Sequence, residues 1–103
     1  MTGFYYTYVL LLQNGNWYVG STDNLNRRMR EHHSRTGGRT TSMYEGELVY
    51  AEACRSLAEA RKREKQLKTG YGRAYLNRRL AFEREKRASG ARLQRYARLR
   101  EQA

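Results

Sequence analysis

The sequence has no proline, one cysteine and no apolar run long enough for a membrane-spanning helix, which takes about 20 residues. The apolar stretch over residues 4–12 is too short to span a bilayer and lacks the basic start of a signal peptide. Because Cys54 is the only cysteine, an internal disulfide is excluded and a reducing cytoplasm is the expected location. Repeats and low-complexity linkers are also absent, so we expect one domain over residues 1–88 with a basic helical extension over residues 89–103.

Acidic residues are scarce, since 10 Asp and Glu stand against 21 Lys and Arg and leave a formal net charge of +11. Residues 1–22 carry no charge, residues 23–54 carry five of each sign, and residues 55–103 carry 16 basic and five acidic side chains. Such a basic half predicts a polyanionic partner, most often nucleic acid, and an arginine-rich solvated surface is the alternative. A membrane partner is disfavoured because the basic half lacks a broad apolar face.

Periodicity and turn signals predict an α+β domain, in which a small, mainly antiparallel three-stranded sheet is flanked by helices in the order β-β-α-β-α-α. Strands are expected over residues 4–12, 16–21 and 47–54, and a loop over residues 39–45. The first helix follows a cap at Thr22 or Asp23 and runs to about residue 35. The second runs from the capping box at residues 56–59 to residue 68, with Gly70 as its left-handed C-terminal residue. A third helix is expected over about residues 73–88, and a basic helix over residues 91–100 follows Gly90.

The turn between the first two strands decides which side chains share a face. A two-residue loop would put Tyr8 and Tyr18 on opposite faces. A loop over residues 13–15, with Gly15 in the left-handed region, pairs Tyr8 with Gly20 and puts both tyrosines on one face. We favour this second register because it leaves an apolar set on the other face, namely Val9, Leu11, Trp17 and Val19. Gly20 then leaves room for a phenol or a ligand to approach the backbone.

Three polar residues interrupt the apolar faces of the predicted helices. Arg28 and His32 lie four residues apart beside the inner stripe of the first helix, whereas Arg27 points away. Glu64 occupies a position in the apolar stripe of the second helix, where a carboxylate needs a cation or hydrogen bonds to offset its desolvation. The alternatives to functional roles are a surface arginine, a packed histidine and a carboxylate paired with an arginine. A hard metal ion is the functional interpretation of the carboxylate.

Two tyrosines, an arginine, a histidine and a glutamate suit the hydrolysis of a phosphodiester in a basic groove. A divalent ion on the carboxylate neutralises phosphate charge and acidifies a water molecule. An arginine fork holds a phosphate oxygen and stabilises the transition state. A tyrosine hydroxyl near the metal can orient or deprotonate the water, but its ordinary pKa of about 10 means that a tyrosine base needs help from the metal or the arginine.

The pair Thr7-Tyr8, followed ten residues later by Tyr18-Val19-Gly20, resembles the paired core motif of the GIY-YIG nuclease superfamily. The resemblance continues through YVGSTDNLNRRMREH and EARKREKQLKTGYGRAYLNRRL and covers roughly residues 4–80. It is close to the small stand-alone bacterial branch, which is similar to the nuclease domain of excision-repair incision subunits. The sequence departs from the motif at one position, where Tyr6 replaces the first glycine.

The resemblance implies that Tyr8 and Tyr18 are the two motif tyrosines of the active site and that Gly20 is the glycine of the second motif. It also implies that Arg28 is the catalytic arginine and that His32 is a histidine common in the site.

The same resemblance assigns Glu64 as the single metal-binding glutamate, with one Mg²⁺ or Mn²⁺ ion. Asn77, or the residue next to it, is the candidate for a family asparagine in the third helix.

The expected function is therefore a metal-dependent endonuclease that hydrolyses phosphodiester bonds in DNA. The resemblance adds DNA repair as one possible role and leaves RNA open as a substrate. The alternatives are a catalytically idle nucleic-acid-binding module of the same fold and a structural or protein-binding domain. A monomer or weak dimer is expected. The candidate contacts to nucleic acid beyond the catalytic set are all basic: Arg27, Arg39, Lys68, Arg73, Arg92 and Arg95.

Overall fold

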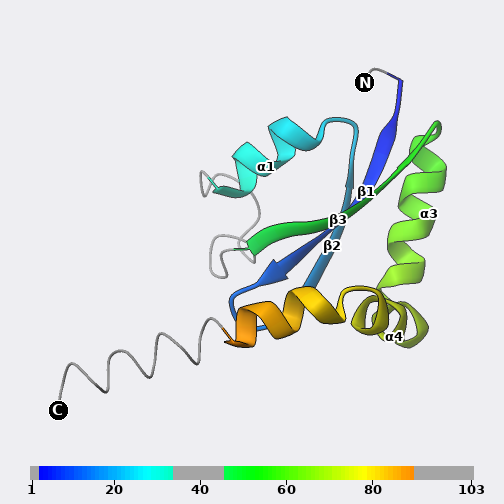
Figure 1. Cartoon of the computed structure of the whole chain (residues 1–103). Coiled ribbons are helices and arrows are strands. Elements are labelled where there is room, and N and C mark those ends of the chain that lie inside the picture. The colour runs from blue at the N-terminus through cyan, green and yellow to red at the C-terminus, as the bar shows by residue number, and fades with distance from the viewer. Residues whose placement is uncertain (1–2, 34–45, 90–103) are drawn as a thin grey trace, which may run out of the picture.

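The computed structural model describes residues 3–33 and 46–89, which form one antiparallel sheet and four helices (Figure 1). This arrangement confirms the predicted α+β class. The strands are ordered β2-β1-β3 across the sheet, so β1 is the central strand. The elements along the chain are β1 (Tyr5–Leu12), β2 (Trp17–Thr22), α1 (Leu25–His33), β3 (Gly46–Cys54), α3 (Leu57–Leu67), α4 (Gly70–Arg79) and a further helix over residues 81–89.

The β1–β2 hairpin has the predicted three-residue loop. Gly15 has a φ of 87°, which favours glycine, and its N–H donates to the Leu12 carbonyl at 2.9 Å. Tyr8 consequently pairs with Gly20, and Leu10 pairs with Tyr18. The predicted register is confirmed.

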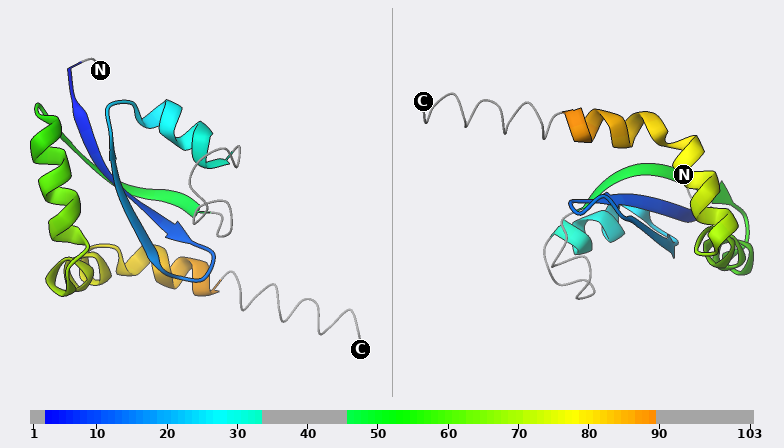
Figure 2. Two further views of the ribbon diagram at one scale, coloured as in Figure 1. Left: turned by 180° about the vertical axis from the view of Figure 1, so that it is seen from behind. Right: turned by 90° about the horizontal axis from the view of Figure 1, so that it is seen from below.

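Helices cover both faces of the sheet (Figure 2). On one face, Leu25 and Met29 of α1 pack against a buried cluster that Tyr8 shares with Leu10 and Leu12. The tyrosine face is therefore part of a second small core, which the sequence patterning did not anticipate.

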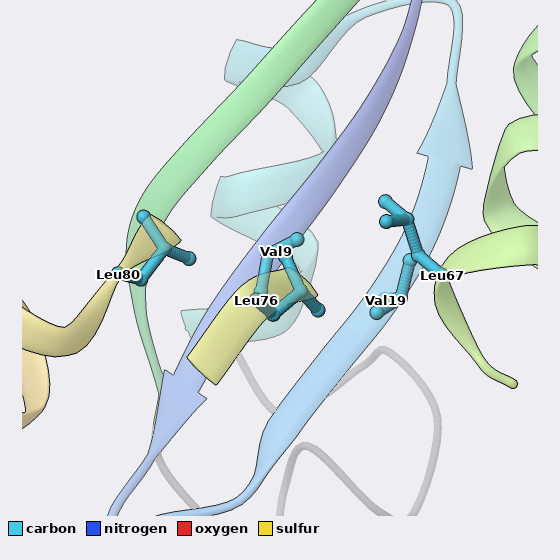
Figure 3. Close-up of a cluster of buried hydrophobic side chains, with 5 residues drawn as sticks. All are labelled: Val9, Val19, Leu67, Leu76 and Leu80. Atoms are coloured by element: carbon cyan, nitrogen blue, oxygen red, sulfur yellow. The ribbon is translucent and has the colours of Figure 1, made fainter. Parts of the chain in front are cut away.

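The opposite face holds the predicted apolar core. Val9 and Val19 of the sheet pack against Leu67 of α3, Leu76 of α4 and Leu80 (Figure 3). These five side chains fix α3 and α4 against β1 and β2, and this packing positions the polar residues of both helices beside β2.

The edge strand β3 contains a β-bulge. Val9 pairs with Tyr50 but the next residue, Leu10, pairs with Leu48, so Val49 is an extra residue on β3. Val49 and Tyr50 both pack against the same buried cluster as a result, although adjacent strand residues ordinarily face opposite sides.

The helix caps differ from the prediction at α1 and agree with it at α3. Asn24, rather than Thr22 or Asp23, caps α1, because its side-chain oxygen accepts from the Arg27 N–H at 3.0 Å. Thr22 instead accepts from the Asn24 N–H. Ser56 caps α3 as predicted and accepts from the Glu59 N–H.

The predicted role of Gly70 is wrong. Gly70 is the first residue of α4, which Thr69 caps by accepting from the Gly72 N–H. The two helices meet so closely that a Cβ on Gly72 would lie 2.3 Å from the Gln66 carbonyl oxygen. Gly72 therefore permits the sharp corner between α3 and α4, and no left-handed residue is used there.

The predicted third helix over residues 73–88 is also wrong, because the structure has two helices that are separated at Leu80. The second of them, over residues 81–89, is fastened to the β1–β2 hairpin. Arg84 donates to the Gly15 carbonyl at 2.9 Å, and Arg87 donates to the carbonyls of Leu11 and Leu12 at 3.0 and 2.8 Å.

Two predicted elements, the loop over residues 39–45 and the basic helix over residues 91–100, lie outside the described residues. In the part of the chain that the structure describes, no helix is both long and apolar enough to cross a bilayer.

Candidate active site

Tyr8 of the central strand connects two side chains of α1. Its hydroxyl lies 3.0 Å from Nε2 of His32 and accepts a hydrogen bond from Nε of Arg28 at 3.1 Å. Tyr8 is 1% exposed and His32 is 7% exposed, so the hydrogen bond between these two rings is shielded from solvent. The helical phase that was predicted to turn Arg28 inward is confirmed.

Gly20 makes space for the Tyr8 phenol. A Cβ at position 20 would lie 2.5 Å from the Tyr8 hydroxyl oxygen and 2.6 Å from the ring carbon that carries it. Real Cβ atoms do not approach other atoms so closely, and therefore any residue larger than glycine would displace the tyrosine. The expected close approach at Gly20 is confirmed, and the approaching group is the phenol.

Tyr18 completes an aromatic cluster around His32. The imidazole meets the Tyr18 ring edge-on, with centroids 5.4 Å apart, and the two tyrosine rings are 6.4 Å apart. Edge-to-face contacts of this kind orient the rings. Because Tyr8 is buried and Tyr18 is only half-buried, Tyr18 is the tyrosine that solvent can reach.

The environment of Tyr8 keeps its hydroxyl protonated. Burial raises the pKa of the phenol above its ordinary value, even though the hydrogen bond and the charge of Arg28 act to lower it. The negative charge of Glu64 acts in the raising direction as well, which places Glu64 within electrostatic reach of Tyr8.

Arg28 and Arg27 have different surroundings. The pKa of Arg28 is raised, chiefly by its hydrogen bond with Tyr8, and Arg28 also donates to Glu31 at 3.0 Å. Arg27 is half-exposed and pairs with Asp23 and Glu31 on the outer side of α1. Of these two arginines, only Arg28 contacts Tyr8.

Glu64 of α3 faces β2. Its Oε1 accepts from the Ser21 hydroxyl at 2.7 Å, and its Oε2 lies 2.6 Å from the ammonium of Lys68. Burial acts to raise the pKa of the Glu64 carboxyl, but the hydrogen bonds from Lys68 and Ser21 outweigh burial and hold the pKa below its ordinary value. Glu64 is therefore ionised at neutral pH. Its hydrogen bond to Ser21, the residue after Gly20 in β2, places the carboxylate beside that strand.

The donor set at Glu64 fits a hard divalent cation. An ionised carboxylate and a hydroxyl oxygen are ligands of the kind that Mg²⁺ and Mn²⁺ prefer. Among residues 3–33 and 46–89, no group of three or more His, Cys, Asp or Glu side chains could hold a metal. A cation at this position would therefore have Glu64 as its carboxylate ligand, with oxygens from water and substrate around it.

A cavity of about 540 Å³ lies along β2, between this edge strand and the α3–α4 corner. It is lined by Tyr18 together with three other residues predicted for the site, Lys68, Arg73 and Asn77. The structure thus brings two of the predicted nucleic-acid contacts to the same hollow as the second motif tyrosine. Three others, Arg39, Arg92 and Arg95, lie outside the described residues.

Four residues of the site were missed by the sequence analysis: Ser21, Glu31, Trp17 and Arg84. Ser21 and Glu31 contact Glu64 and Arg28, respectively. The indole N–H of Trp17 donates to Asn77 at 2.8 Å, although the sequence placed Trp17 only in the core. The alternation of β2 in the sequence already places Ser21 on the same side of the strand as Trp17. Their hydrogen-bond partners, Glu64 and Asn77, lie on helices far along the chain, and the alternation does not indicate them.

The chain is similar in sequence to known proteins. The chain is 39% identical over 66 residues to the UPF0213 protein DP2720 of Desulfotalea psychrophila, a match that spans 62% of this chain and 60% of that protein. It is 36% identical over 67 residues to a UPF0213 protein of Enterococcus faecalis, across 62% of this chain and 76% of the relative. The solution NMR structure of the UPF0213 protein BH0048 from Bacillus halodurans is 30% identical in sequence, and the match covers 71% of this chain and 81% of that chain, with a TM-score of 0.46.

The family model for the GIY-YIG catalytic domain matches residues 4–79. This match extends over well more than half of the sequence and contains Tyr8, Tyr18, Arg28 and Glu64, and the chain therefore belongs to the GIY-YIG family of nuclease domains.

Proposed function

We propose that this protein is a divalent-metal-dependent endonuclease that hydrolyses phosphodiester bonds in DNA. The observation that carries the proposal is the hydrogen-bonded network of Arg28, Tyr8 and His32, which lies within electrostatic reach of the ionised Glu64. An arginine, a pair of side chains that can pass a proton and an ionised carboxylate that can hold a metal are the kinds of group that support phosphodiester hydrolysis.

Arg28 is assigned to bind the scissile phosphate. Its guanidinium has five N–H donors, and Tyr8 and Glu31 hold the Nε and Nη1 side of the fork in place. The side chain is 27% exposed, so the group reaches solvent from a fixed position. A preorganised cation of this kind stabilises the charge that develops on phosphate oxygens in the transition state.

Tyr8 and His32 are assigned to hold and move a proton. The raised pKa of Tyr8 means that its hydroxyl does not act as a base unless its own proton leaves. Nε2 of His32 lies 3.0 Å from the hydroxyl and is assigned to receive that proton when this nitrogen carries none. Tyr18, the tyrosine that solvent reaches, is assigned to contact the substrate or the attacking water.

Glu64 is assigned as the metal ligand. Its depressed pKa keeps the carboxylate charged at neutral pH, and Ser21 orients it. A bound Mg²⁺ or Mn²⁺ would supply neutralisation of phosphate charge and would lower the pKa of a water molecule.

The proposal is tested with a panel of single-stranded, duplex and branched DNA and matched RNA, each incubated with Mg²⁺, Mn²⁺ or EDTA. We expect metal-dependent cleavage of DNA by the wild type and none by the Glu64→Gln variant. Glu59→Gln, an exposed position on the same helix, is the matched control and should cleave at the wild-type rate. Binding of DNA without cleavage of any substrate would instead establish the idle binding module.

A further inference from the structure

Asn77 of α4 receives two hydrogen bonds on one atom of its side chain. The indole Nε1–H of Trp17 lies 2.8 Å from Oδ1, and Nη1 of Arg84 lies 2.7 Å from the same atom. Both partners are donors only, so the atom between them must be the amide oxygen. The orientation of the amide is thereby fixed, and its NH₂ group is the end directed away from both partners.

Trp17 and Arg84 are themselves held in place. The Arg84 guanidinium lies over the Trp17 ring, 5.0 Å from its centroid, and Nη2 of Arg84 donates to the Gly15 carbonyl at 2.9 Å. The hairpin loop, β2, α4 and the helix over residues 81–89 therefore meet at Asn77. Asn77 is exposed, but hydrogen bonds from two different elements to its oxygen hold the amide in one orientation, which is the condition for a preorganised donor.

Asn77 also lines the cavity beside β2, together with Tyr18, Lys68 and Arg73. The charged residues that line this cavity are all cationic (Lys68, Arg73 and Arg84), and the amide N–H groups of Asn77 add neutral hydrogen-bond donors. An anion with several oxygens, such as a backbone phosphate, matches such a donor set.

We propose that Trp17 and Arg84 are positioning residues that orient the Asn77 amide so that its NH₂ donates to a substrate phosphate in this cavity. The inference rests on the proposed function for the nature of the substrate. Arg84 lies beyond residues 4–79, the range that matches the family, so this positioning device is supplied by a helix that the family match does not include. The proposal thus gives the helix over residues 81–89 a role in the site.

The test compares variants that remove the Asn77 NH₂ group with variants that remove the hydrogen bonds positioning it. Asn77→Asp keeps an acceptor for Trp17 and Arg84 but replaces the NH₂ by oxygen, so we expect the dissociation constant for a DNA oligonucleotide in EDTA to rise about tenfold or more. Trp17→Phe and Arg84→Lys preserve net charge and should raise this dissociation constant about three- to tenfold. Arg87→Lys, on the same helix and bonded to the same hairpin, is the matched control and should bind as the wild type does.

A second readout reports on Asn77 itself. In ¹H–¹⁵N spectra, the Asn77 side-chain NH₂ signals should shift when DNA is added to the wild type and should broaden or move in Trp17→Phe before any DNA is added. Backbone spectra of each variant establish that it is folded. Unchanged DNA affinity in Asn77→Asp and Trp17→Phe, or NH₂ signals that do not respond to DNA, would overturn the inference. DNA binding is measured without metal and does not depend on cleavage. An absence of cleavage would therefore count against the proposed function, whereas unchanged DNA affinity in the variants would count against the positioning of Asn77.

Discussion

The ammonium of Lys68 lies 2.6 Å from Oε2 of Glu64, one helical turn away along α3. A divalent ion on that carboxylate would have to share or displace this contact. Lys68 also lines the cavity beside β2, where we propose that a substrate phosphate binds, so a displaced ammonium would contact that phosphate.

Replacement of Lys68 by Met should therefore tighten the binding of Mn²⁺ in the absence of DNA. The side chain of Lys68 is half-exposed and the pair is screened by solvent, so we expect an increase in affinity of about two- to fivefold. Calorimetric titration with Mn²⁺ measures the change. Lys65→Met, an exposed lysine on the same helix, is the control, and an unchanged or weaker affinity in Lys68→Met would contradict the prediction.

Replacement of Arg28 by Ala should lower kcat for DNA cleavage by about 10²- to 10³-fold, as loss of one preorganised donor typically does. Arg27→Ala removes the same charge one residue earlier but leaves the Arg28–Tyr8 contact intact, so its kcat should stay near that of the wild type. The cleavage rates of the two variants are compared with that of the wild type by single-turnover kinetics on one oligonucleotide. Equal losses in the two variants would mean that net charge, rather than the position of Arg28, determines the rate.

Replacement of Gly20 by Ala should reduce the free energy of unfolding by about 1–3 kcal/mol, because the added methyl would overlap the buried Tyr8 hydroxyl. Gly70→Ala is the matched control: nothing lies within 4 Å of a Cβ at that helical position, and the change should stabilise by about 0.4–1 kcal/mol. Denaturant unfolding measures both. A Gly20→Ala protein as stable as the wild type would show that Tyr8 moves aside at little cost.

Tyr8 should make the protein less stable at alkaline pH. The folded pKa is raised, so the contribution of the buried neutral phenol is fully present below the unfolded value of about 10 and is lost as the pH rises through the folded pKa. The unfolding free energy of the wild type should therefore fall more steeply above about pH 10 than that of Tyr8→Phe. The comparison cancels the contribution of Tyr50, whose pKa is raised as well. Parallel curves for the two proteins would refute a perturbed Tyr8.

The features that the sequence predicted correctly depend on local rules. Gly15 in a polar loop between two alternating strands specified the hairpin register, and the register in turn placed Tyr8 opposite Gly20. The spacing of Arg28 and His32 on one helix face was sufficient to put both beside Tyr8.

The features that were predicted incorrectly, or missed, depend on contacts between distant segments. Gly70 follows a helix, as C-terminal glycines do, but Thr69 caps a new helix there. The close contact of Gly72 with α3, which lets the two helices meet at this corner, links residues of two separate helices. The Ser21–Glu64 bond spans 43 residues and the Arg84–Gly15 bond spans 69, and no periodicity within either segment indicates its partner.

Tyr8 belongs both to the buried cluster under α1 and to the network that holds Arg28. A substitution there would disturb folding and chemistry together, so natural variation has little room to alter this wall of the site. Arg73, which lines the cavity beside β2, is exposed and belongs to neither buried cluster. If the proposed function holds, differences in substrate choice among relatives of this protein should therefore accumulate at the exposed positions of the α3–α4 corner, while the sheet side stays constant.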